Sequence, residues 1–564
     1  MKKIILTAFC LIYCKVSFAQ IPLTINEKRI LDKNQVHTPI FGRNNRHWDL
    51  LGATNAQYNV PYTSSVSAGF ANSMWIGGLD NTNTLHVSAN TYRQNGADFW
   101  PGPIDTINAN YTPNTVYQNI WKVDCNDITA FATAYNTGSV TAGTYTIPVD
   151  MQTYPAKETG NLMRNMAPFN DVNNDGNYSP SQGDYPLIKG HQQILSIYND
   201  NYTTHSETNG LPMGIEIHER SYAYYEPTAN DSMKAINYTT FYNFEIYNRS
   251  TNNYHDVFVC DWSDADLGYY LNDYIGSDTI NKFVYQYNAD NTEIGYLPVL
   301  SHALINTNCS NDGIDNNHNG TIDEPNEHFL MDKATFYNNN IGAFPPATTN
   351  PNSAVDYYNY IQGFWKDNSP QTFGGNAYGG TLPTSYVYSG NPETQTGWTE
   401  GTAGNLKGDR RFLMSSGPFN FPAQSKIEWG YAIVFSLDTT STNNTITKFN
   451  TIVKRDVRNV RYYEQAHTNS QCQPIINVGL KEEKLLNIVN LYPNPGKDVI
   501  YINLNKNVND ATITIADMLG RIIKTQSIKS TYQTQINTND LTQGIYLITI
   551  KTVNEKYTSK WIRQ

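Results

Sequence analysis

Short segments of alternating apolar and polar residues, separated by turn-forming residues, dominate the middle of the chain. Residues 236–248 alternate in this way, with large apolar or aromatic side chains at Tyr238, Tyr242, Phe244 and Ile246. A period of two is typical of a β-strand that buries one face. A polar turn over residues 248–253 and an apolar run over residues 255–260 follow, so the order predicts an antiparallel hairpin.

A second segment of the same kind lies near residue 411. Residues 411–414 and 427–435 are rich in apolar side chains, and Gly417-Pro418-Phe419 lies between them. This segment predicts a second hairpin. We therefore expect a mostly β body built from tandem β-sandwich units of the immunoglobulin-like type.

The connections of this body are expected to include long loops. Residues 338–353 and 367–405 are rich in Gly, Asn and Pro, and both stretches are too long for hairpin turns. No internal repeat of fixed length is visible in the sequence. The loops are therefore expected to run over the surface of the sandwich units, either ordered or partly mobile.

One segment has the period of a helix rather than a strand. Between residues 446 and 463 this spacing places one apolar stripe along an amphipathic α-helix. The stripe consists of Ile446, Phe449, Ile452, Val453, Val457, Val460 and Tyr463. Because it is short of large aromatic side chains, we expect the helix to pack on the body rather than on a membrane surface or a partner.

The beginning of the chain has the features of a signal peptide over residues 1–19. Two lysines precede a ten-residue apolar run, which is too short to span a bilayer, and Ser17-Phe18-Ala19 places small residues before a cut at Gln20. A lipoprotein cut before Cys10 or Cys14 is the alternative, which the bulky preceding residues disfavour. The remaining segments are an exposed lead-in over 20–60, the body over 61–464, a linker over 465–486 and a C-terminal module over 487–564.

The composition narrows the possible partners. Charged residues make up only 16% of the chain, the net charge is -11, and 41 tyrosines contribute to a neutral polar surface. Phosphate binding needs clustered Lys and Arg, so we expect no nucleic-acid partner. The mean hydropathy of -0.52 and the lack of a second long apolar run predict a soluble mature protein. Four cysteines remain after the signal peptide, and the sequence leaves open all three pairings of Cys125, Cys260, Cys309 and Cys472.

A loop beginning at Asp171 has the pattern of a calcium site. Oxygen-bearing side chains occupy alternate positions, and Gly176 stands where such a loop turns sharply. The usual position-12 carboxylate is replaced by Gln182, but Asp184 resembles the closing carboxylate of dockerin-like loops. We predict that Ca²⁺ is bound here, and the alternative is an Asn/Asp/Gly turn without metal. The predicted ligands are Asp171, Asn173, Asp175, Asn177 and Asp184.

A second loop repeats the pattern between residues 312 and 324. It is similar to the Asp-Gly-x-Asp-Asn loops of secreted bacterial proteins, and Gly320 stands at the turn position. Calcium is again the predicted ion, with the same metal-free alternative. The predicted ligands are Asp315, Asn317, Asn319, Thr321, Asp323 and Glu324.

A third acidic cluster, formed by Asp261, Asp264, Asp266 and Asp273, follows a predicted strand. These carboxylates are candidates for a Ca²⁺ site or for the general acid and base of a glycosidase. A solvated acidic turn explains the cluster equally well, so we assign no catalytic residue. The sequence also contains no H-E-x-x-H, G-x-S-x-G or Walker A motif.

The C-terminal module carries the most specific signature of the chain. Its motifs are Tyr492-Pro493-Asn494-Pro495, apolar strands near residues 499 and 513, a turn ending at Gly520, Gly544 with Tyr546, and a basic end. In this order they resemble the type A sorting domain of the type IX secretion system of Bacteroidota. The resemblance implies a small immunoglobulin-like β-sandwich, passage through the secretion machinery, and removal by its sorting peptidase. Gln564 at the terminus departs from the usual basic or apolar residue.

The resemblance also implies a location. Cargo of this system crosses the periplasm and is then released, or anchored at the cell surface on lipopolysaccharide. The body is similar to uncharacterised secreted surface proteins of the same bacteria, at residues 75–78, 99–103 and 262–268. We therefore expect a non-enzymatic, calcium-stabilised adhesion or matrix protein that contacts carbohydrate or a host surface. A secreted hydrolase, a glycosidase or peptidase using body carboxylates, is the alternative.

Overall fold

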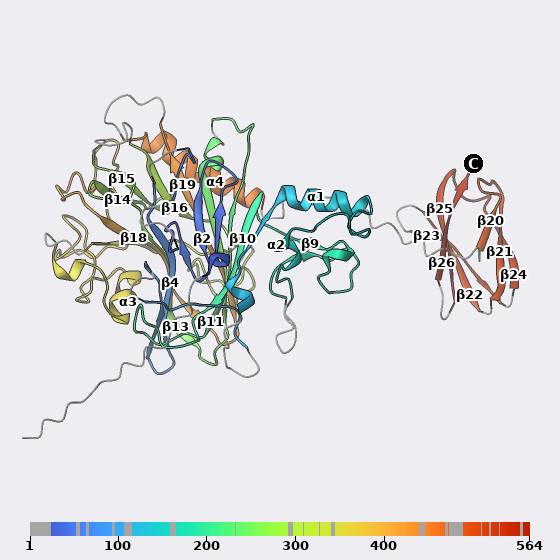
Figure 1. The fold of residues 1–564 in the computed structure, drawn as a ribbon, viewed down its shortest axis with the longest axis horizontal. Coiled ribbons are helices and arrows are strands. Elements are labelled where there is room, and N and C mark those ends of the chain that lie inside the picture. Colours follow the sequence, from blue (N-terminus) through green and yellow to red (C-terminus); the bar gives the residue numbers. More distant parts are fainter. Residues whose placement is uncertain are drawn as a thin grey trace, which may run out of the picture. The chain divides into compact units, whose positions relative to one another are not determined.

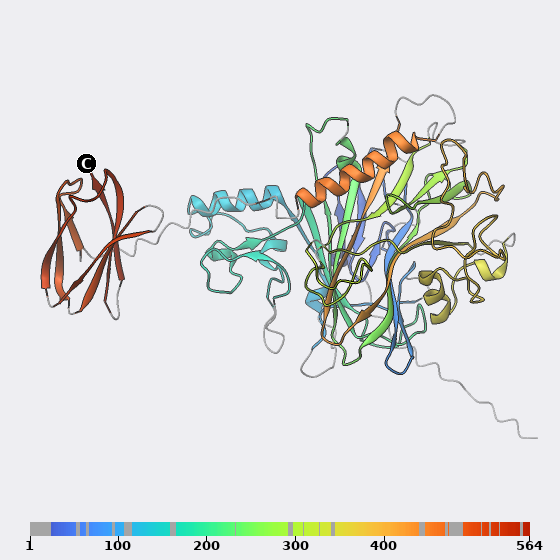
Figure 2. The ribbon, with the colours of Figure 1, turned by 180° about the vertical axis from the view of Figure 1, so that it is seen from behind.

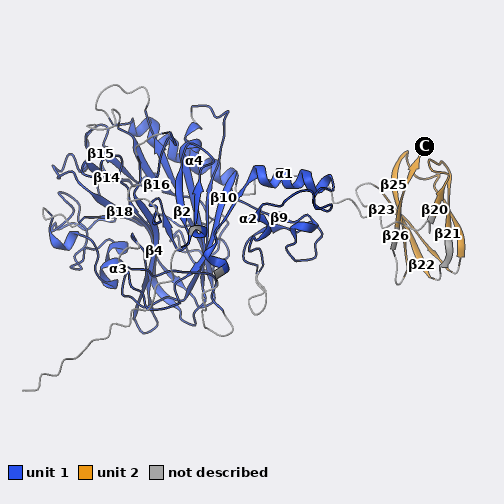
Figure 3. Ribbon diagram, viewed as in Figure 1, with its two compact units in different colours: residues 1–476 blue, residues 477–564 orange. Residues whose placement is uncertain are grey.

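The computed structural model divides the chain into two compact units, residues 1–476 and residues 477–564 (Figure 3). The first unit contains two large antiparallel sheets, the helices α3 (Ala354–Gln362) and α4 (Lys454–Ala466), and a side lobe, and the second is a small β-module (Figure 1). The structure describes residues 24–51, 57–63, 67–92, 96–105, 115–157, 165–231, 233–290, 297–307, 309–325, 327–339, 344–438, 446–467, 472, 489–508, 510–517, 521–529, 531–552 and 556–564. The expected signal peptide and most of the expected linker lie outside these residues.

The first sheet of the body has eight strands. Its order is β1 (Lys28–Leu31), β2 (Thr38–Phe41), β3 (Asn45–Arg46), β4 (Ala71–Asp80), β13 (Tyr254–Asp264), β18 (Arg410–Phe421) and β17 (Lys333–Asn338), with β5 (Leu85–Ser88) paired to β4. Its two longest interfaces join β13 to β4 and to β18, so segments far apart in sequence form its centre.

The second sheet has nine strands. Its order is β14 (Asp273–Asp278), β15 (Phe283–Asn288), β16 (Val299–Leu304), β19 (Lys426–Ser436), β12 (Thr239–Asn248), β11 (Ile215–Ala223), β10 (Gln192–Asn199) and β6 (Trp100–Pro101), with β7 (Trp121–Asp124) paired to β10. Short 3₁₀ turns connect several of these strands: η1 (Ile25–Glu27), η2 (Thr115–Gln118), η5 (Lys234–Tyr238) and η6 (Pro346–Thr348).

One hydrophobic core lies between the two sheets, and it contains side chains from both. Polar contacts also cross it: the Tyr431 hydroxyl on β19 donates to Asn72 Oδ1 on β4 at 2.6 Å. Arg46 on β3 pairs with Glu219 on β11 at 2.7 Å, and both side chains are almost fully buried. The mostly β body is confirmed, but the expected series of sandwich units is instead one pair of large sheets around a shared core.

Both predicted hairpins are wrong, although their strands are present. β12 and β13 follow each other in the chain but belong to opposite sheets, and so do β18 and β19. At each place the chain arches across the core instead of turning back beside itself. An arch and a hairpin can use the same polar connection between two alternating strands, so the local pattern does not distinguish them.

The segment expected as an exposed lead-in, residues 20–60, also differs from the prediction. Its described part contributes β1, β2 and β3 to the first sheet, and Leu31, Ile40 and Phe41 are buried. The short strands are interrupted by residues with positive φ, including Arg43 and Asn44, and this irregularity hides the alternation that would have marked them.

The predicted amphipathic helix is present, and it covers the outer face of the second sheet. It begins with a π-helical turn, η7 (Phe449–Val453), and continues as α4 (Lys454–Ala466), drawn in orange in Figure 2. Val453, Val457 and Val460 share a buried cluster with aromatic residues of the sheet. Packing on the body is therefore confirmed. Among the described residues, no helix is long and apolar enough to cross a membrane.

The outer face of the first sheet is covered by α3 (Ala354–Gln362) and by ordered loops. Tyr388 and Trp398, from the stretch over residues 367–405 that was expected to be a surface loop, are buried in the main core. The Tyr357 ring from α3 lies 4.8 Å from that of Trp75 on β4. The described part of this stretch is therefore ordered and covers the outer face of the first sheet.

A side lobe projects from β7 and β10 and has its own small core. It contains α1 (Cys125–Asn136), α2 (Val149–Gln152), β8 (Phe169–Asn170), η4 (Pro180–Gln182) and β9 (Tyr185–Pro186). A disulfide joins Cys125 at the start of α1 to Cys472, which follows α4. Cys260 and Cys309 are buried thiols. The sequence left three pairings open, and the structure contains the Cys125–Cys472 bond of one of them.

The C-terminal unit is a two-layered β-sandwich, as predicted. One sheet contains β20 (Val489–Tyr492), β21 (Val499–Val508) and β24 (Thr531–Asn537). The other contains β23 (Ile522–Ile528), β22 (Ala511–Asp517), β25 (Gly544–Lys551) and β26 (Lys556–Arg563). Alternate residues of these strands form a separate apolar core that includes Ile513, Ile548 and Trp561.

Candidate metal centre

Acidic side chains converge where the chain crosses from the first sheet to the second. Asp264 ends β13, Asp266 lies in the crossover, and Asp273 begins β14. Asp409 joins them from the residue before β18. One carboxylate oxygen from each of Asp264, Asp266 and Asp409 lies within 4.8 Å of the others. We call these three residues together with Asp273 the acidic cluster.

The charges of the acidic cluster are only partly balanced. Arg411 Nη2 donates to Asp264 Oδ2 at 2.8 Å, and Nη1 donates to Asp409 Oδ1. The neighbouring Arg410 is already paired with Glu400 at 3.0 Å. Four carboxylates against the single Arg411 guanidinium would leave a net charge of -3 if all were ionised. Buried charge of this size is unfavourable unless protons or a cation neutralise it.

Several carboxylate oxygens of the acidic cluster are buried and have no hydrogen-bond partner among the described residues. They are Asp264 Oδ1, Asp266 Oδ1 and both oxygens of Asp273. Burial raises the pKa of Asp264 to about 6. Burial and the neighbouring carboxylates also raise the pKa of Asp266 and of Asp273 well above the usual range. Without a cation, this environment favours protonated carboxyl groups.

The donor set fits calcium. Ca²⁺ prefers six to eight oxygen ligands and accepts carboxylates from irregular loops. Asp264, Asp266 and Asp409 would supply three ligands, and Asp273 lies close enough for the charges of Asp409 and Asp264 to raise its pKa. A divalent ion bound by these three carboxylates would reduce the residual charge to -1 and could give Asp264 Oδ1 and Asp266 Oδ1 a partner. The side chains of the acidic cluster therefore fit a calcium ion.

Asp261 does not join the acidic cluster, unlike the grouping made from the sequence. Its Oδ1 accepts from Asn72 Nδ2 at 2.6 Å, and its Oδ2 lies 2.6 Å from His302 Nδ1. Asp261 and Asp264 are three positions apart on one strand, so their side chains leave on opposite faces. Conversely, no local pattern points to Asp409, which follows Asp264 by 145 positions.

The first calcium-type loop lies in the side lobe and folds around its first residue. Asp171 Oδ1 accepts from Asp175 N at 3.2 Å, and Oδ2 accepts from Gly176 N at 2.7 Å. Asn173 Oδ1 also accepts from Asp175 N. Asn174 and Gly176 have φ values of 58° and 75°, so the backbone turns sharply at the fourth and sixth positions. Positions one, three and five are thereby brought together.

The second calcium-type loop adopts the same arrangement in a different part of the body. Asp315 Oδ1 accepts from Asn319 N at 3.0 Å, and Oδ2 accepts from Gly320 N at 2.8 Å. Asn317 Oδ1 again accepts from the fifth residue. His318 and Gly320 have φ values of 59° and 90°. Two segments with different surroundings thus share one local conformation.

The remaining predicted ligands serve to close these loops. Both oxygens of Asp184 accept backbone N–H groups, from Val172 at 2.9 Å and Ser179 at 2.7 Å. Asp323 Oδ1 accepts from Asp312 N and Gly313 N, so it closes the base of the second loop. Further hydrogen bonds join positions within each loop. In the first loop Asn177 N donates to Asp175 Oδ1. In the second loop Thr321 N donates to Asn319 Oδ1, and Asn317 Nδ2 donates to Glu324 Oε1.

The C-terminal unit holds its opening motif against its last strand. Asn494 Nδ2 donates to Lys560 O at 2.8 Å, and Asn494 Oδ1 accepts from Ile562 N at 3.0 Å. Trp561 Nε1 donates to Pro493 O at 2.8 Å, and the Trp561 ring is fully buried. The residues that mark the start and the end of the module in the sequence therefore form one contact.

Other residues of the motif have clear structural positions. Tyr492 ends β20, Pro495 follows Asn494 in the turn, and Gly544 begins β25. The Tyr546 hydroxyl donates to Thr542 O at 2.8 Å. Gly520 lies outside the described residues. Residues 490–564 match the family model of the secretion system C-terminal sorting domain. This module is a type IX sorting domain.

The sorting domain determines the route of the protein. It interacts with the type IX secretion machinery, which exports the chain to the cell surface or the extracellular space. The match covers the C-terminal unit and leaves the body, with its acidic cluster and its two calcium-type loops, outside it. No curated protein matches the chain.

Proposed function

We propose that the exported protein is a non-enzymatic adhesion or matrix protein whose β-sandwich body is stabilised by Ca²⁺. The acidic cluster is the observation that carries this proposal. It joins three carboxylates within 4.8 Å and leaves buried oxygens without partners. These features favour a bound divalent cation over a solvated acidic turn.

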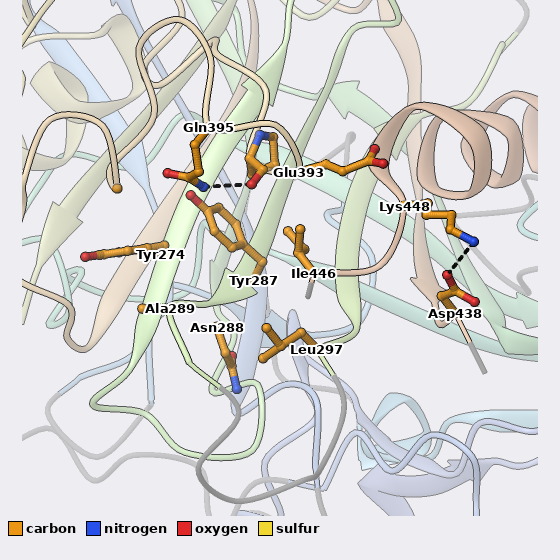
Figure 4. Close-up of a pocket in the computed structure, with 12 residues that line it drawn as sticks. Tyr274, Tyr287, Asn288, Ala289, Leu297, Glu393, Gln395, Asp438, Ile446 and Lys448 are labelled. Atoms are coloured by element: carbon orange, nitrogen blue, oxygen red, sulfur yellow. Dashed lines mark hydrogen bonds and ion pairs between the residues drawn. The ribbon is translucent and has the colours of Figure 1, made fainter. Parts of the chain in front are cut away.

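The position of the acidic cluster favours a structural role for the ion. Asp264 ends β13 and Asp409 directly precedes β18, and both strands belong to the first sheet. Asp273 begins β14, an edge strand of the second sheet. A cation would therefore tie the crossover between the sheets. The exposed fractions of Asp264, Asp273 and Asp409 are 1%, 0% and 4%, and none of the three lines the cavity of Figure 4, which favours a structural ion over a bound substrate.

The two calcium-type loops would add peripheral sites. Each brings oxygen-bearing side chains together at positions one, three and five, and each has a glycine at the sixth position. The first would stabilise the side lobe, and the second would stabilise the connection between β16 and β17. Calcium in the extracellular space would keep such exposed loops in one conformation.

The hydrolase alternative needs carboxylates that face an accessible pocket. A cavity of about 570 Å³ contains Glu393 and Asp438 (Figure 4). Glu393 Oε2 already accepts from Asn450 N, and Asp438 pairs with Lys448 at 3.4 Å. This arrangement does not favour an acid and base pair, so we expect no hydrolysis of polysaccharide or peptide by the body.

The finer steps of export are part of the proposal. The chain would cross the periplasm after removal of the signal peptide, and the sorting peptidase would then remove the C-terminal unit. The body would be released or attached to surface lipopolysaccharide. The contacts of the body would be with carbohydrate or with a host or matrix surface.

The calcium claim is tested by thermal unfolding of the full chain with added Ca²⁺ and with a chelator. We expect a higher Tm with Ca²⁺, because a ligand that binds only the folded state stabilises it. Asp266→Asn should remove part of that shift. Asp256→Asn is the matched control, because Asp256 lies on the same strand as Asp264 with a 54% exposed side chain, and it should retain the shift. Equal Tm values with Ca²⁺ and chelator would overturn the proposal.

A further inference from the structure

The cavity beside the β14–β15 hairpin has the features of a ligand pocket (Figure 4). Its walls come from that hairpin, from the connection over residues 392–401, and from Asp438, Ile446 and Lys448, which lie between β19 and η7. The volume of about 570 Å³ lies within the range of about 300–1,000 Å³ that is typical of small-molecule sites.

Two tyrosines give the cavity a rigid aromatic wall. Tyr274 and Tyr287 face each other across β14 and β15, with ring centroids 5.8 Å apart and an interplanar angle of 64°. The Tyr274 hydroxyl donates to Asn405 O at 2.8 Å, so its ring is fixed. Leu297 and Ile446 add apolar surface beside them. An apolar ring face can therefore stack here without reordering the wall.

The Tyr287 hydroxyl is the second observation. Tyr287 is 3% exposed, and its hydroxyl has no hydrogen-bond partner among the described residues. In Figure 4 this hydroxyl points toward Gln395 on the rim of the cavity. A buried hydroxyl without a partner is unfavourable, and a ligand with its own hydroxyl group would supply one.

The rim supplies polar groups with little net charge. Gln395 has a φ of 51°, and its amide Nε2 donates to Pro392 O at 2.7 Å, which holds the side chain over the cavity. Glu393 lies beside it, and Asp438 is paired with Lys448. The lining therefore carries a formal charge of -1, from two carboxylates and one ammonium group. This balance disfavours phosphate and sulfate groups, which need several cations.

We propose that this cavity binds a neutral saccharide. The apolar face of a sugar ring would stack on Tyr274, and its hydroxyl groups would bond to the Tyr287 hydroxyl, Gln395 and Glu393. This inference rests on the proposed adhesion function and gives it a ligand class. The acidic cluster is not needed for it, because none of its residues lines the cavity.

The test is a glycan array probed with the full chain in the presence of Ca²⁺. The array should carry short neutral hexose and N-acetylhexosamine oligosaccharides, together with sulfated and uronic-acid oligosaccharides as competitors. We expect retention on neutral glycans. The strongest neutral oligosaccharide is then titrated against variants by calorimetry. Retention on the anionic glycans alone, or on none, would overturn the proposal.

The variants separate binding from folding. Tyr287→Phe removes only the hydroxyl and should weaken binding by about three- to tenfold, the effect of one hydrogen bond, without lowering the Tm. Gln395→Ala should weaken binding to a similar extent. Tyr462→Ala, which removes a tyrosine that is 69% exposed on α4, should bind like the wild type. Undiminished binding by both cavity variants would place the saccharide elsewhere and contradict the proposal.

The outcomes also distinguish this inference from the proposed function. If Ca²⁺ raises the Tm but no neutral glycan binds, the saccharide site fails and the calcium-stabilised body remains. If a neutral glycan binds and is also cleaved, the non-enzymatic role fails and the saccharide site remains.

Discussion

Asp264 and Asp409 share one guanidinium group, that of Arg411, although 145 positions separate them in the sequence. Their nearest carboxylate oxygens also lie within 4.8 Å of each other and of Asp266. The guanidinium of Arg411 pairs with both carboxylates, but its single positive charge balances only one of the four negative charges that the acidic cluster carries when ionised. The contact lies where the chain crosses between the two sheets, at the place where we propose that a further cation binds.

The first prediction concerns the two calcium-type loops. Asp171→Ala and Asp315→Ala each remove the carboxylate that accepts the fifth and sixth backbone N–H groups of its loop. Each variant should lose part of the calcium-dependent increase in Tm, and the double variant should lose more than either one. Differential scanning calorimetry with Ca²⁺ and with chelator measures this.

Loss of calcium sensitivity must be separated from simple damage to the loops. In the chelated state the loop variants should already be less stable than the chelated wild type, because each lacks the backbone hydrogen bonds of its aspartate. The quantity to compare is therefore the calcium-dependent shift in Tm of each protein, not its Tm alone. A calcium-dependent shift that is unchanged in the double variant would assign the effect to the acidic cluster alone.

The second prediction concerns the disulfide. Cys125 and Cys472 join the side lobe to the end of α4, and the bridge closes a loop with a sequence separation of 347 residues. Cys125→Ser with Cys472→Ser should lower the free energy of unfolding by about 2–5 kcal/mol, as for other native disulfides. Denaturant unfolding with and without reductant measures this.

Reductant is the internal control for the disulfide. It should destabilise the wild type and leave the double serine variant unchanged. The same sensitivity to reductant in both proteins would show that another thiol pair, such as Cys260 with Cys309, is responsible.

The third prediction concerns how the free energy of unfolding falls at acidic pH. Burial alone would raise the pKa of Glu245, but the charge of Arg220, 2.5 Å away, lowers it to about 2 from the ordinary 4.5. Because this folded-state pKa is depressed, the ionised pair stabilises the protein above about pH 4.5, and that stabilisation is lost as the pH falls toward about 2.

Glu245→Gln makes this dependence measurable. At about pH 7 the variant should be less stable than the wild type by about 3–5 kcal/mol, because Arg220 is left buried without its partner. The difference should narrow as the pH falls from about 4.5 to about 2, since only the wild type loses the charge pair. Denaturant unfolding over this range measures it, and a difference that stays constant would refute the assignment.

The fourth prediction concerns delivery. Asn494→Ala removes the two hydrogen bonds that the Asn494 side chain makes with the last strand of the sorting domain. We expect reduced delivery to the cell surface, and deletion of residues 487–564 should abolish it and leave the body in the periplasm. Fractionation followed by immunoblotting measures both.

A matched substitution in the same module shows whether the effect is local. Tyr532 is 61% exposed on β24, so Tyr532→Ala should be delivered like the wild type. Normal surface delivery of the truncated chain would contradict the role of the sorting domain.

Much of the fold could be predicted because individual strands carry a local signal. The alternation around Tyr242 and Phe244 and the apolar stripe that contains Val457 and Val460 both describe which side chains are buried. The partner of each strand has no such signal. β12 therefore looked like half of a hairpin, although it lies in the opposite sheet from β13.

The candidate site was predictable to the same extent. Asp264, Asp266 and Asp273 lie close together in sequence, so one short segment identified them. Asp261 was included because spacing alone does not say which face of a strand will meet the cluster. Asp409 could not be found, because only the pairing of β18 with β13 brings it near.

The most direct test is the metal content of the full chain, purified with trace Ca²⁺ and measured by inductively coupled plasma mass spectrometry. We predict bound calcium after extensive dialysis, with less calcium in a variant that combines Asp266→Asn and Asp409→Asn, and the wild-type amount in Asp256→Asn. A wild-type protein that retains no calcium, or an acidic-cluster variant that retains the full amount, would contradict the claim that this cluster holds a calcium ion.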